Sequence, residues 1–142
     1  MTAGTSHAAS IVIGRPAETA FAFIADAENL CRWSFGTWET RHHADGLVEG
    51  RSLLDGAVTF VKISADAAAR SIWFQLGAGA GALTPRIVAH IVPGAHVGIP
   101  GDHCVLTLLA WRAADMSDER WRRLTAAHEF EMILLKSLIE RL

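Results

Sequence analysis

The final stretch of the chain, from Ser117 to Leu142, constrains the fold more than any other segment. Its apolar residues recur at helical spacing, which predicts one long helix with a broad apolar stripe. The members of that stripe are Trp121, Leu124, His128, Met132, Leu135, Ile139 and Leu142. Ser117 suits the N-cap, and Asp118 and Glu119 follow where the helix dipole favours negative charge. Such a helix cannot stand alone, so it must lie against a large apolar surface into which His128 would point.

The rest of the sequence supplies that surface as a sheet. A short strand over Ser10–Gly14 precedes a helix over Ala17–Ala25, and Asp26 can cap a second short helix. From Thr37 onward the apolar period changes to two, and Asp45-Gly46 is typical of a hairpin turn. The strands predicted there cover Trp38–Ala44, Leu47–Asp55, Ala57–Ala65, Ser71–Leu76, Arg86–Val92 and His103–Arg112. This order indicates an α+β fold in which an antiparallel sheet packs on the terminal helix.

Composition limits the class of protein. The length suits a single domain spanning 1–142, and 51% of the residues are hydrophobic. The net charge is −2 with no basic run, so nucleic acid is not an expected partner. No apolar run is long enough to span a membrane, and Met1 to Ser10 lacks the pattern of a signal peptide. Cys31 and Cys104 lie in apolar contexts, which favours free thiols and a cytoplasmic location.

Several local phrases resemble the START-like (Bet v 1-like) superfamily and, within it, the bacterial polyketide cyclase/dehydrase (SRPBCC) branch. They are Ile11–Ile13 with Arg15–Glu18, Phe21 with Phe23–Asp26, Glu28–Leu30 with Arg32–Trp33, and Met116–Glu119 with Leu134–Lys136 and Ile139–Glu140. The resemblance covers essentially the whole chain, and it fades between Leu47 and Leu83. It implies a helix-grip fold: a curved antiparallel sheet of about seven strands wraps a long C-terminal helix, with two short helices after the first strand. It also implies a ligand cavity between sheet and helix, but no shared catalytic motif.

His128 is the first candidate for catalysis. Its neighbours on the stripe turn it towards the sheet, and Glu131, three residues on, could hydrogen-bond its ring. A histidine with a pKa of about 6.5 can donate or accept a proton at neutral pH, so in a dry cavity His128 could serve as general acid or base. A core histidine that is satisfied by the backbone or by Glu131 would explain the same pattern.

Aromatic and apolar side chains are the candidates for the cavity wall. Trp33 and Trp38 flank the end of the two short helices, which close the cavity mouth in the superfamily, while Trp111 and Trp121 flank the start of the last helix. Flat aromatic walls suit a ring-bearing ligand, although plain core packing would account for any single tryptophan. The full set of candidates is Trp33, Trp38, Phe74, Trp111, Trp121, Leu124, Met132 and Leu135.

Arg86 and His90 leave open which face of their strand is buried. By the period of two they share one face, while Ile87, Ala89 and Ile91 make the other. The clean apolar face should be the inner one, which would put Arg86 and His90 outside. The reversed register would place a cationic pair inside, where it suits a carboxylate or enolate oxygen.

No metal or organic cofactor is expected. The histidines at 90, 96 and 103 lack the tight paired spacing of structural zinc sites, and the glycines of Gly77–Gly81 lack the spacing of a phosphate-binding loop.

Three hypotheses about function remain. The chain could be a cofactor-independent cyclase, dehydratase or isomerase in which His128 moves a proton on a small ring-bearing or polyketide-like molecule. It could instead be a carrier that binds a hydrophobic ligand, as in lipid transport. An interaction module would follow if the alanine-rich strands collapsed onto the helix. A homodimer is the commonest oligomer of soluble proteins and is possible here.

Overall fold

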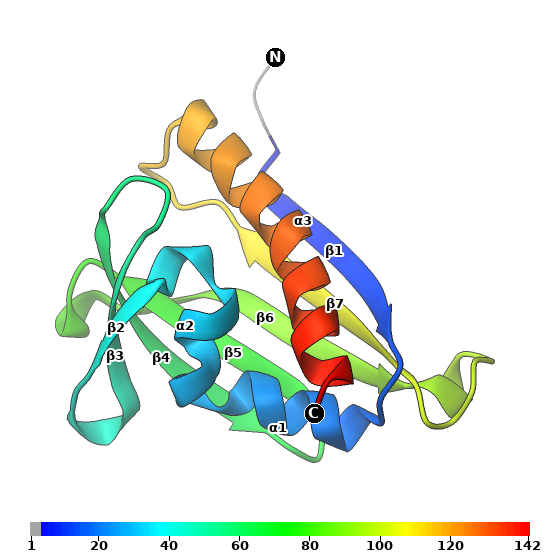
Figure 1. The fold of residues 1–142 in the computed structure, drawn as a ribbon. Coiled ribbons are helices and arrows are strands. Elements are labelled where there is room, and N and C mark those ends of the chain that lie inside the picture. The colour runs from blue at the N-terminus through cyan, green and yellow to red at the C-terminus, as the bar shows by residue number, and fades with distance from the viewer. Residues whose placement is uncertain (1–3) are drawn as a thin grey trace.

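One seven-stranded antiparallel sheet, curved around a long helix, forms the body of the molecule (Figure 1). The computed structural model describes residues 4–142, so residues 1–3 of the stretch tested above for a signal peptide lie outside it. The strands are β1 (Ser6–Ile13), β2 (Glu39–His42), β3 (Leu47–Arg51), β4 (Val58–Asp66), β5 (Ser71–Gly77), β6 (Thr84–Pro93) and β7 (Cys104–Trp111). They are ordered β1-β7-β6-β5-β4-β3-β2, so the first and last strands pair and the others follow as a meander.

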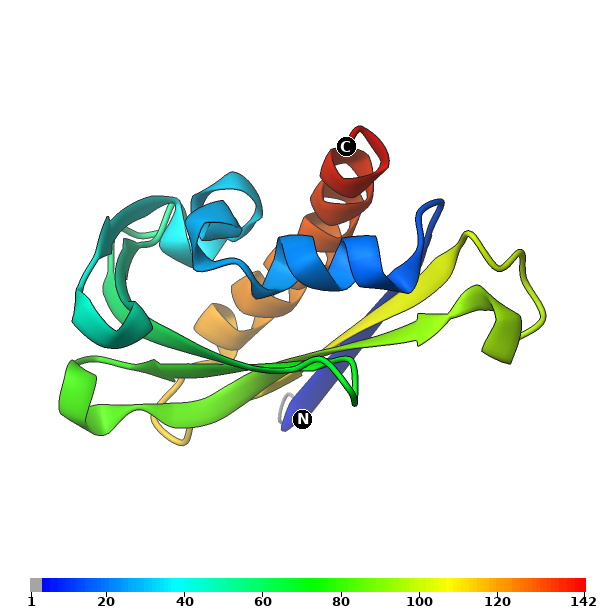
Figure 2. The same ribbon diagram turned by 90° about the horizontal axis from the view of Figure 1, so that it is seen from below.

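The helices all lie on one side of this sheet (Figure 2). They are α1 (Ala17–Ala25), α2 (Leu30–Trp33) and α3 (Asp118–Glu140), and a 3₁₀ turn η2 (Phe35–Thr37) follows α2. The sheet curls at its β2–β3 end, where it rises beside α2 (Figure 2). The predicted α+β helix-grip fold, with two short helices after the first strand, is therefore confirmed. Within residues 4–142, no helix is long and apolar enough to cross a membrane.

Strict alternation in β7 builds the floor of the core. Cys104, Leu106, Leu108 and Ala110 are at most 1% exposed, and the residues between them face the outer side of the sheet. The stripe on α3 meets this floor through Met132, Leu135 and Ile139, which belong to the same buried cluster. Ser117 caps the helix as predicted, since its side chain accepts a hydrogen bond from the amide of Arg120.

The predicted boundaries differ from the structure mainly at chain ends and turns. β1 begins at Ser6 rather than Ser10, because it pairs with β7 along its whole length. The stripe does not include Leu142, which is 53% exposed, because the helix ends at Glu140. The strand expected over Leu47–Asp55 stops at Arg51 and gives way to a loop in which Gly56 has a positive φ of 72°.

Side-chain contacts to β1 fasten the C-terminal half of α3. Lys136 donates through Nζ to the carbonyl of Val12 at 2.9 Å and pairs with Glu140 at 2.6 Å. The same carboxylate of Glu140 accepts from the amide of Gly14 at 2.6 Å. These bonds hold the last turns of the helix against the sheet edge.

Gly50 allows β3 to approach η2 closely. A Cβ at this position would overlap both the side chain and the backbone of Thr37. Any larger residue would therefore push η2 away from the sheet.

We expect Gly50→Ala to lower the free energy of unfolding by about 1–3 kcal/mol, because the added methyl group has no room. Gly81→Ala is the matched control, since a Cβ at Gly81 would meet nothing within 4 Å, and it should change stability by less than about 0.5 kcal/mol. Urea denaturation of both variants measures the difference. Equal stabilities would show that η2 does not lie against β3.

Candidate functional site

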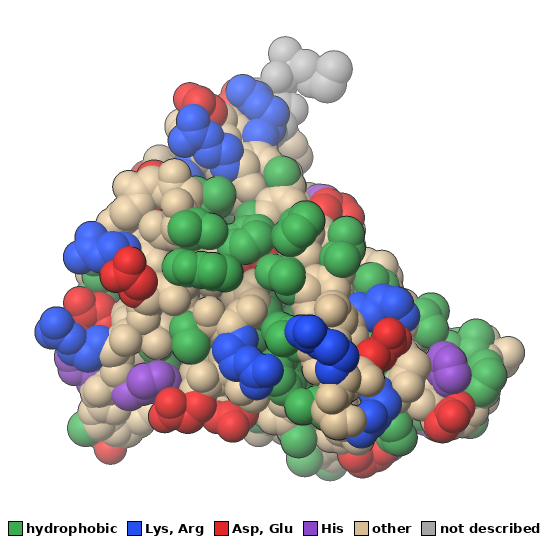
Figure 3. Space-filling model, viewed as in Figure 1, with side chains coloured by type: hydrophobic (Ala, Val, Ile, Leu, Met, Phe, Trp, Pro, Cys, Tyr) green, Lys and Arg blue, Asp and Glu red, His purple; other side chains and the backbone are tan. Residues whose placement is uncertain are grey.

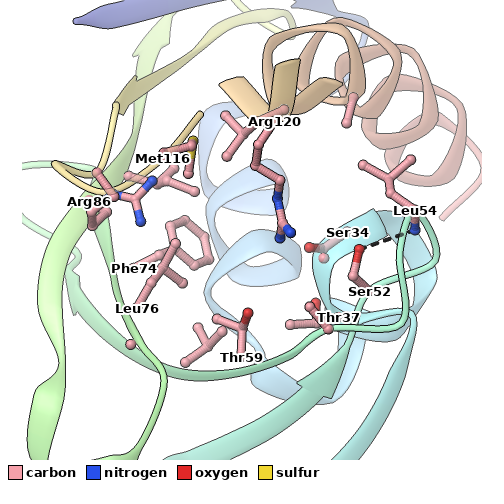
Figure 4. Close-up of a pocket in the computed structure, with 18 of the residues that line it drawn as sticks. Ser34, Thr37, Ser52, Leu54, Thr59, Phe74, Leu76, Arg86, Met116 and Arg120 are labelled. Atoms are coloured by element: carbon pink, nitrogen blue, oxygen red, sulfur yellow. Dashed lines mark hydrogen bonds between the residues drawn. The ribbon is translucent and has the colours of Figure 1, made fainter. Parts of the chain in front are cut away.

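A cavity of about 790 Å³ lies between the N-terminal half of α3, the concave side of β4–β6, and the segment from α2 to the β3–β4 loop (Figure 4). Its apolar lining includes Leu30, Trp33, Val61, Phe74, Leu76, Ile87, Leu108 and Leu124. From α3 it receives Arg120, Leu124, Ala127, His128 and Glu131, and nothing beyond Glu131. The cavity therefore begins where the tight packing of α3 on the sheet ends.

Four of the residues that line this cavity carry a buried polar atom with no hydrogen-bond partner within residues 4–142. These atoms are Nε1 of Trp33, Oγ1 of Thr37, Nη2 of Arg86 and Nδ1 of His128. A fifth such atom, Nε2 of His7, does not line the cavity and lies 3.1 Å from a carboxylate oxygen of Glu129. Buried polar groups are nearly always paired, so a cluster of unpaired ones around one cavity is unusual.

His128 and Glu131 face each other across one turn of α3. Nε2 of His128 lies 3.8 Å from Oε1 of Glu131, and the two residues are only 5% and 4% exposed. The other oxygen of Glu131 accepts a 2.8 Å hydrogen bond from the amide of Phe35. α3 and η2 are thereby linked beside the cavity.

Burial separates the pKa values of this pair. Burial raises the pKa of Glu131 from 4.5 to about 8, although the amide of Phe35 acts in the opposite direction. The pKa of His128 is lowered to about 4, mainly by burial and also by the nearby His7 and Arg86. The pKa of His128 therefore lies well below the value of about 6.5 expected from the sequence. At neutral pH the site holds a carboxylic acid beside a neutral imidazole.

A β-bulge brings Arg86 to the cavity. Phe74 pairs with Ile87 and Gln75 pairs with Pro85, so Arg86 is an extra residue in β6. Its Nε donates to the carbonyl of Trp111 at 2.8 Å.

Arg86 and His90, whose side of the strand the sequence leaves open, therefore lie in different surroundings. Ala89 and Ile91 are buried, and Ile87 lines the cavity, as the apolar face predicts. His90 is exposed and bonds to Ser71 at 3.0 Å, so only Arg86 reaches the cavity.

Two of the expected wall residues lie outside the cavity. Trp38 is 41% exposed and packs on Phe35, with their ring centroids 5.9 Å apart, because η2 turns Thr37 inward and the next residue outward. Hydrophobic side chains gather on the face of the molecule that Figure 3 shows. Trp111 stacks on Trp73 at 5.7 Å on the opposite side of the sheet, since its side chain alternates with the buried Ala110.

Three residues of α3 are buried without lining the cavity. Trp121, Met132 and Leu135 are at most 3% exposed, yet none of them contributes to the cavity wall. The cavity contacts one side of α3, formed by Arg120, Leu124, Ala127, His128 and Glu131. This side is rotated by about one residue around the helix from the centre of the predicted stripe. Of the expected wall, Trp33, Phe74 and Leu124 line the cavity.

Several cavity residues were not anticipated from the sequence. Arg120 reaches in from α3 and pairs with Asp55 of the β3–β4 loop, while Ser34, Thr37 and Ser52 present hydroxyl groups (Figure 4). Short polar residues in loops carry no periodic signal, so only their position in space identifies them. Among residues 4–142, no three His, Cys, Asp or Glu side chains form a group that could hold a metal ion.

Comparison with known proteins bears on the fold. No family model matches the chain, and no curated protein matches it either. Solved structures do match. A START superfamily protein from Mycobacterium smegmatis is 16% identical with a TM-score of 0.66, and the match covers 97% of this chain and 99% of that one. The chain has a START-like fold.

Two other similar structures are described as aromatase/cyclases. The Zhui aromatase/cyclase from Streptomyces sp. R1128 is 14% identical with a TM-score of 0.68, and the match covers 96% of this chain and 93% of that one. The di-domain aromatase/cyclase BexL of the BE-7585A biosynthetic pathway is 20% identical with a TM-score of 0.70. That match covers 96% of this chain and 47% of BexL. At these identities the likeness concerns the START-like fold alone.

Glu131→Gln tests the raised pKa. Between pH 4.5 and about 8 the folded wild type binds a proton that the unfolded chain releases, so its stability falls as pH rises. Glutamine keeps an oxygen for the amide of Phe35 but does not titrate. We expect the stability of the variant relative to wild type to rise across this window by at most about 1.4 kcal/mol per pH unit. Urea denaturation at several pH values measures it, and a constant difference would contradict a buried neutral acid.

Proposed function

We propose that this START-like domain binds a small, largely hydrophobic organic molecule in the cavity beside α3. The observation that carries the proposal is that four residues lining one cavity carry buried polar atoms without partners. A ligand with oxygen atoms on an apolar body would form hydrogen bonds with these polar groups. Its apolar body would fill the space between the apolar side chains of the wall. The volume of about 790 Å³ is within the range of small-molecule sites, roughly 300–1,000 Å³.

A ring-bearing ligand is the form that the walls favour. Trp33 and Phe74 meet edge to face at 5.9 Å, and both line the cavity. Such aromatic walls pack well on a flat ring system. The similarity to proteins described as aromatase/cyclases supports the same class of ligand, including polyketide-like molecules.

We also propose a catalytic role, for which the Glu131 and His128 pair is the specific observation. A neutral carboxylic acid can donate a proton, and the unpartnered Nδ1 of a neutral imidazole can accept one. On a carbonyl compound, His128 would remove a proton next to the carbonyl while Glu131 protonated an oxygen. Cyclisation, dehydration and isomerisation need no more than such proton transfers, whereas a carrier would use the same groups only to orient its ligand.

Ligand binding is tested with N-phenyl-1-naphthylamine, a neutral fluorescent probe. We expect wild type to bind it and Ala127→Phe to lose most of the binding, because Ala127 lines the cavity. Ala126→Phe is the matched control, since Ala126 is exposed on the neighbouring position of α3, and it should bind as wild type does. Native mass spectrometry of the purified wild type, followed by denaturing extraction, would identify any retained molecule. Equal binding by both variants would contradict a site in this cavity.

Proton transfer is tested with 2-tetralone in D₂O, by following deuterium incorporation next to the carbonyl. We expect wild type to accelerate the exchange and either His128→Gln or Glu131→Gln to reduce the acceleration about 100-fold. The wild-type rate should decline as pH rises through about 8, because Glu131 then loses its proton. Binding without acceleration would favour the carrier.

A further inference from the structure

Arg86 brings a positive charge to the cavity without a counter-ion from the protein. None of the ion pairs formed within residues 4–142 includes it, whereas Arg70, Arg112, Arg120 and Arg123 each pair with a carboxylate. Its Nε is occupied by the carbonyl of Trp111, but Nη2 is buried and has no partner. A half-buried charge without an ion-pair partner is partly desolvated, and a ligand anion would offset that cost.

We propose that the ligand is an organic anion whose carboxylate, enolate or phenolate oxygen binds the guanidinium of Arg86. This inference rests on the proposed ligand-binding function and names the chemical class of the ligand. A guanidinium held through one nitrogen presents its remaining N–H groups in a fixed direction, which suits an anionic oxygen.

No other charged group around the cavity forms an ion pair with Arg86. Arg120 is paired with Asp55. Glu131 is protonated and His128 is neutral at pH 7, so neither compensates Arg86. Asp115 also lines the cavity and attracts Arg86, but it is exposed and forms no ion pair with it. The guanidinium of Arg86 therefore lacks a carboxylate in contact with it, and an anionic ligand could take that place.

The opposite wall indicates the rest of the ligand. Arg86 projects from one side of the cavity, and Ser34, Thr37 and Ser52 lie on the other, with Phe74 and Leu76 on the wall near Arg86 (Figure 4). The anionic group would therefore sit at one end of an apolar body, and hydroxyl groups would face the other end. The expected molecule is amphipathic, with its charge at the Arg86 end.

Competition between two ligands of one shape tests this inference. 2-Naphthoate and 2-naphthamide share a ring system and differ in charge, and each would be titrated against bound N-phenyl-1-naphthylamine. Wild type should bind 2-naphthoate about 10- to 100-fold more tightly than the amide. Arg86→Met should remove that preference while retaining the neutral probe, and Arg86→Lys should restore part of it. Arg123→Met is the matched control and should retain the preference, because Arg123 pairs with Glu119 and does not line the cavity. Arg120→Met tests the other arginine of the cavity.

The outcomes separate this inference from the function on which it rests. If wild type fails to bind the neutral probe, the proposed ligand-binding function is wrong. If it binds the probe but shows no preference for 2-naphthoate, or if Arg86→Met keeps the preference, only the anion inference is wrong. Loss of the preference in Arg120→Met but not in Arg86→Met would move the anion to Arg120.

Thermal unfolding of the unliganded variant gives a second readout. Arg86→Met removes a half-buried charge that has no ion-pair partner, but also the hydrogen bond to the carbonyl of Trp111, so its Tm should stay close to that of wild type. A clear fall in Tm would show that Arg86 supports the fold rather than a ligand. 2-Naphthoate should raise the Tm of wild type but not that of Arg86→Met.

Discussion

The attachment of the C-terminal half of α3 to β1 is the interaction on which the rest of the structure depends. Lys136 and Glu140 bond to the backbone at the end of that strand, while Leu135 and Ile139 are fully buried over the sheet. With one half of the helix fixed in this way, the other half lies beside the curled end of the sheet. The cavity lies there, and its lining includes no residue of α3 beyond Glu131. One helix therefore completes the core with one half and lines a potential binding site with the other.

Desolvation is the common cause of the shifted pKa values around the cavity. It lowers the pKa of His128, raises that of Glu131 and lowers that of Arg86. In each case the charged form is disfavoured because the surrounding wall is largely apolar. A core filled with side chains, the third hypothesis from the sequence, would be expected to pair or exclude such groups rather than collect them. Their collection around one space is what favours a ligand over an interaction module.

The sequence predicts the fold well and the cavity wall only in part, for a physical reason. Periodicity identifies which side of an element is buried, so the helix over Ala17–Ala25 and the inner positions Ala89 and Ile91 are predicted correctly. A residue in a cavity wall, however, has the same periodic pattern in the sequence as a core residue. It differs only in that the side facing the cavity touches no other residue. Trp33 lines the cavity while Trp121 is buried elsewhere, although both looked alike in the sequence. The bulge that turns Arg86 inward breaks the period of two at a single residue, and no local signal marks it.

Phe35 connects the protonation of Glu131 to the wall of the cavity. Its amide donates to Glu131, its carbonyl accepts from the amide of Leu53, and its ring stacks on Phe130 at 5.8 Å. The segment that carries Thr37 and the loop that carries Ser52 are therefore both fastened at Phe35. Ionisation of Glu131 would strengthen the bond to the amide but would bury a charge beside Phe35, and the second effect is the larger because the pKa is raised. The neutral acid is thus the form that the folded wall favours, so the group proposed for proton transfer also helps to hold the site together.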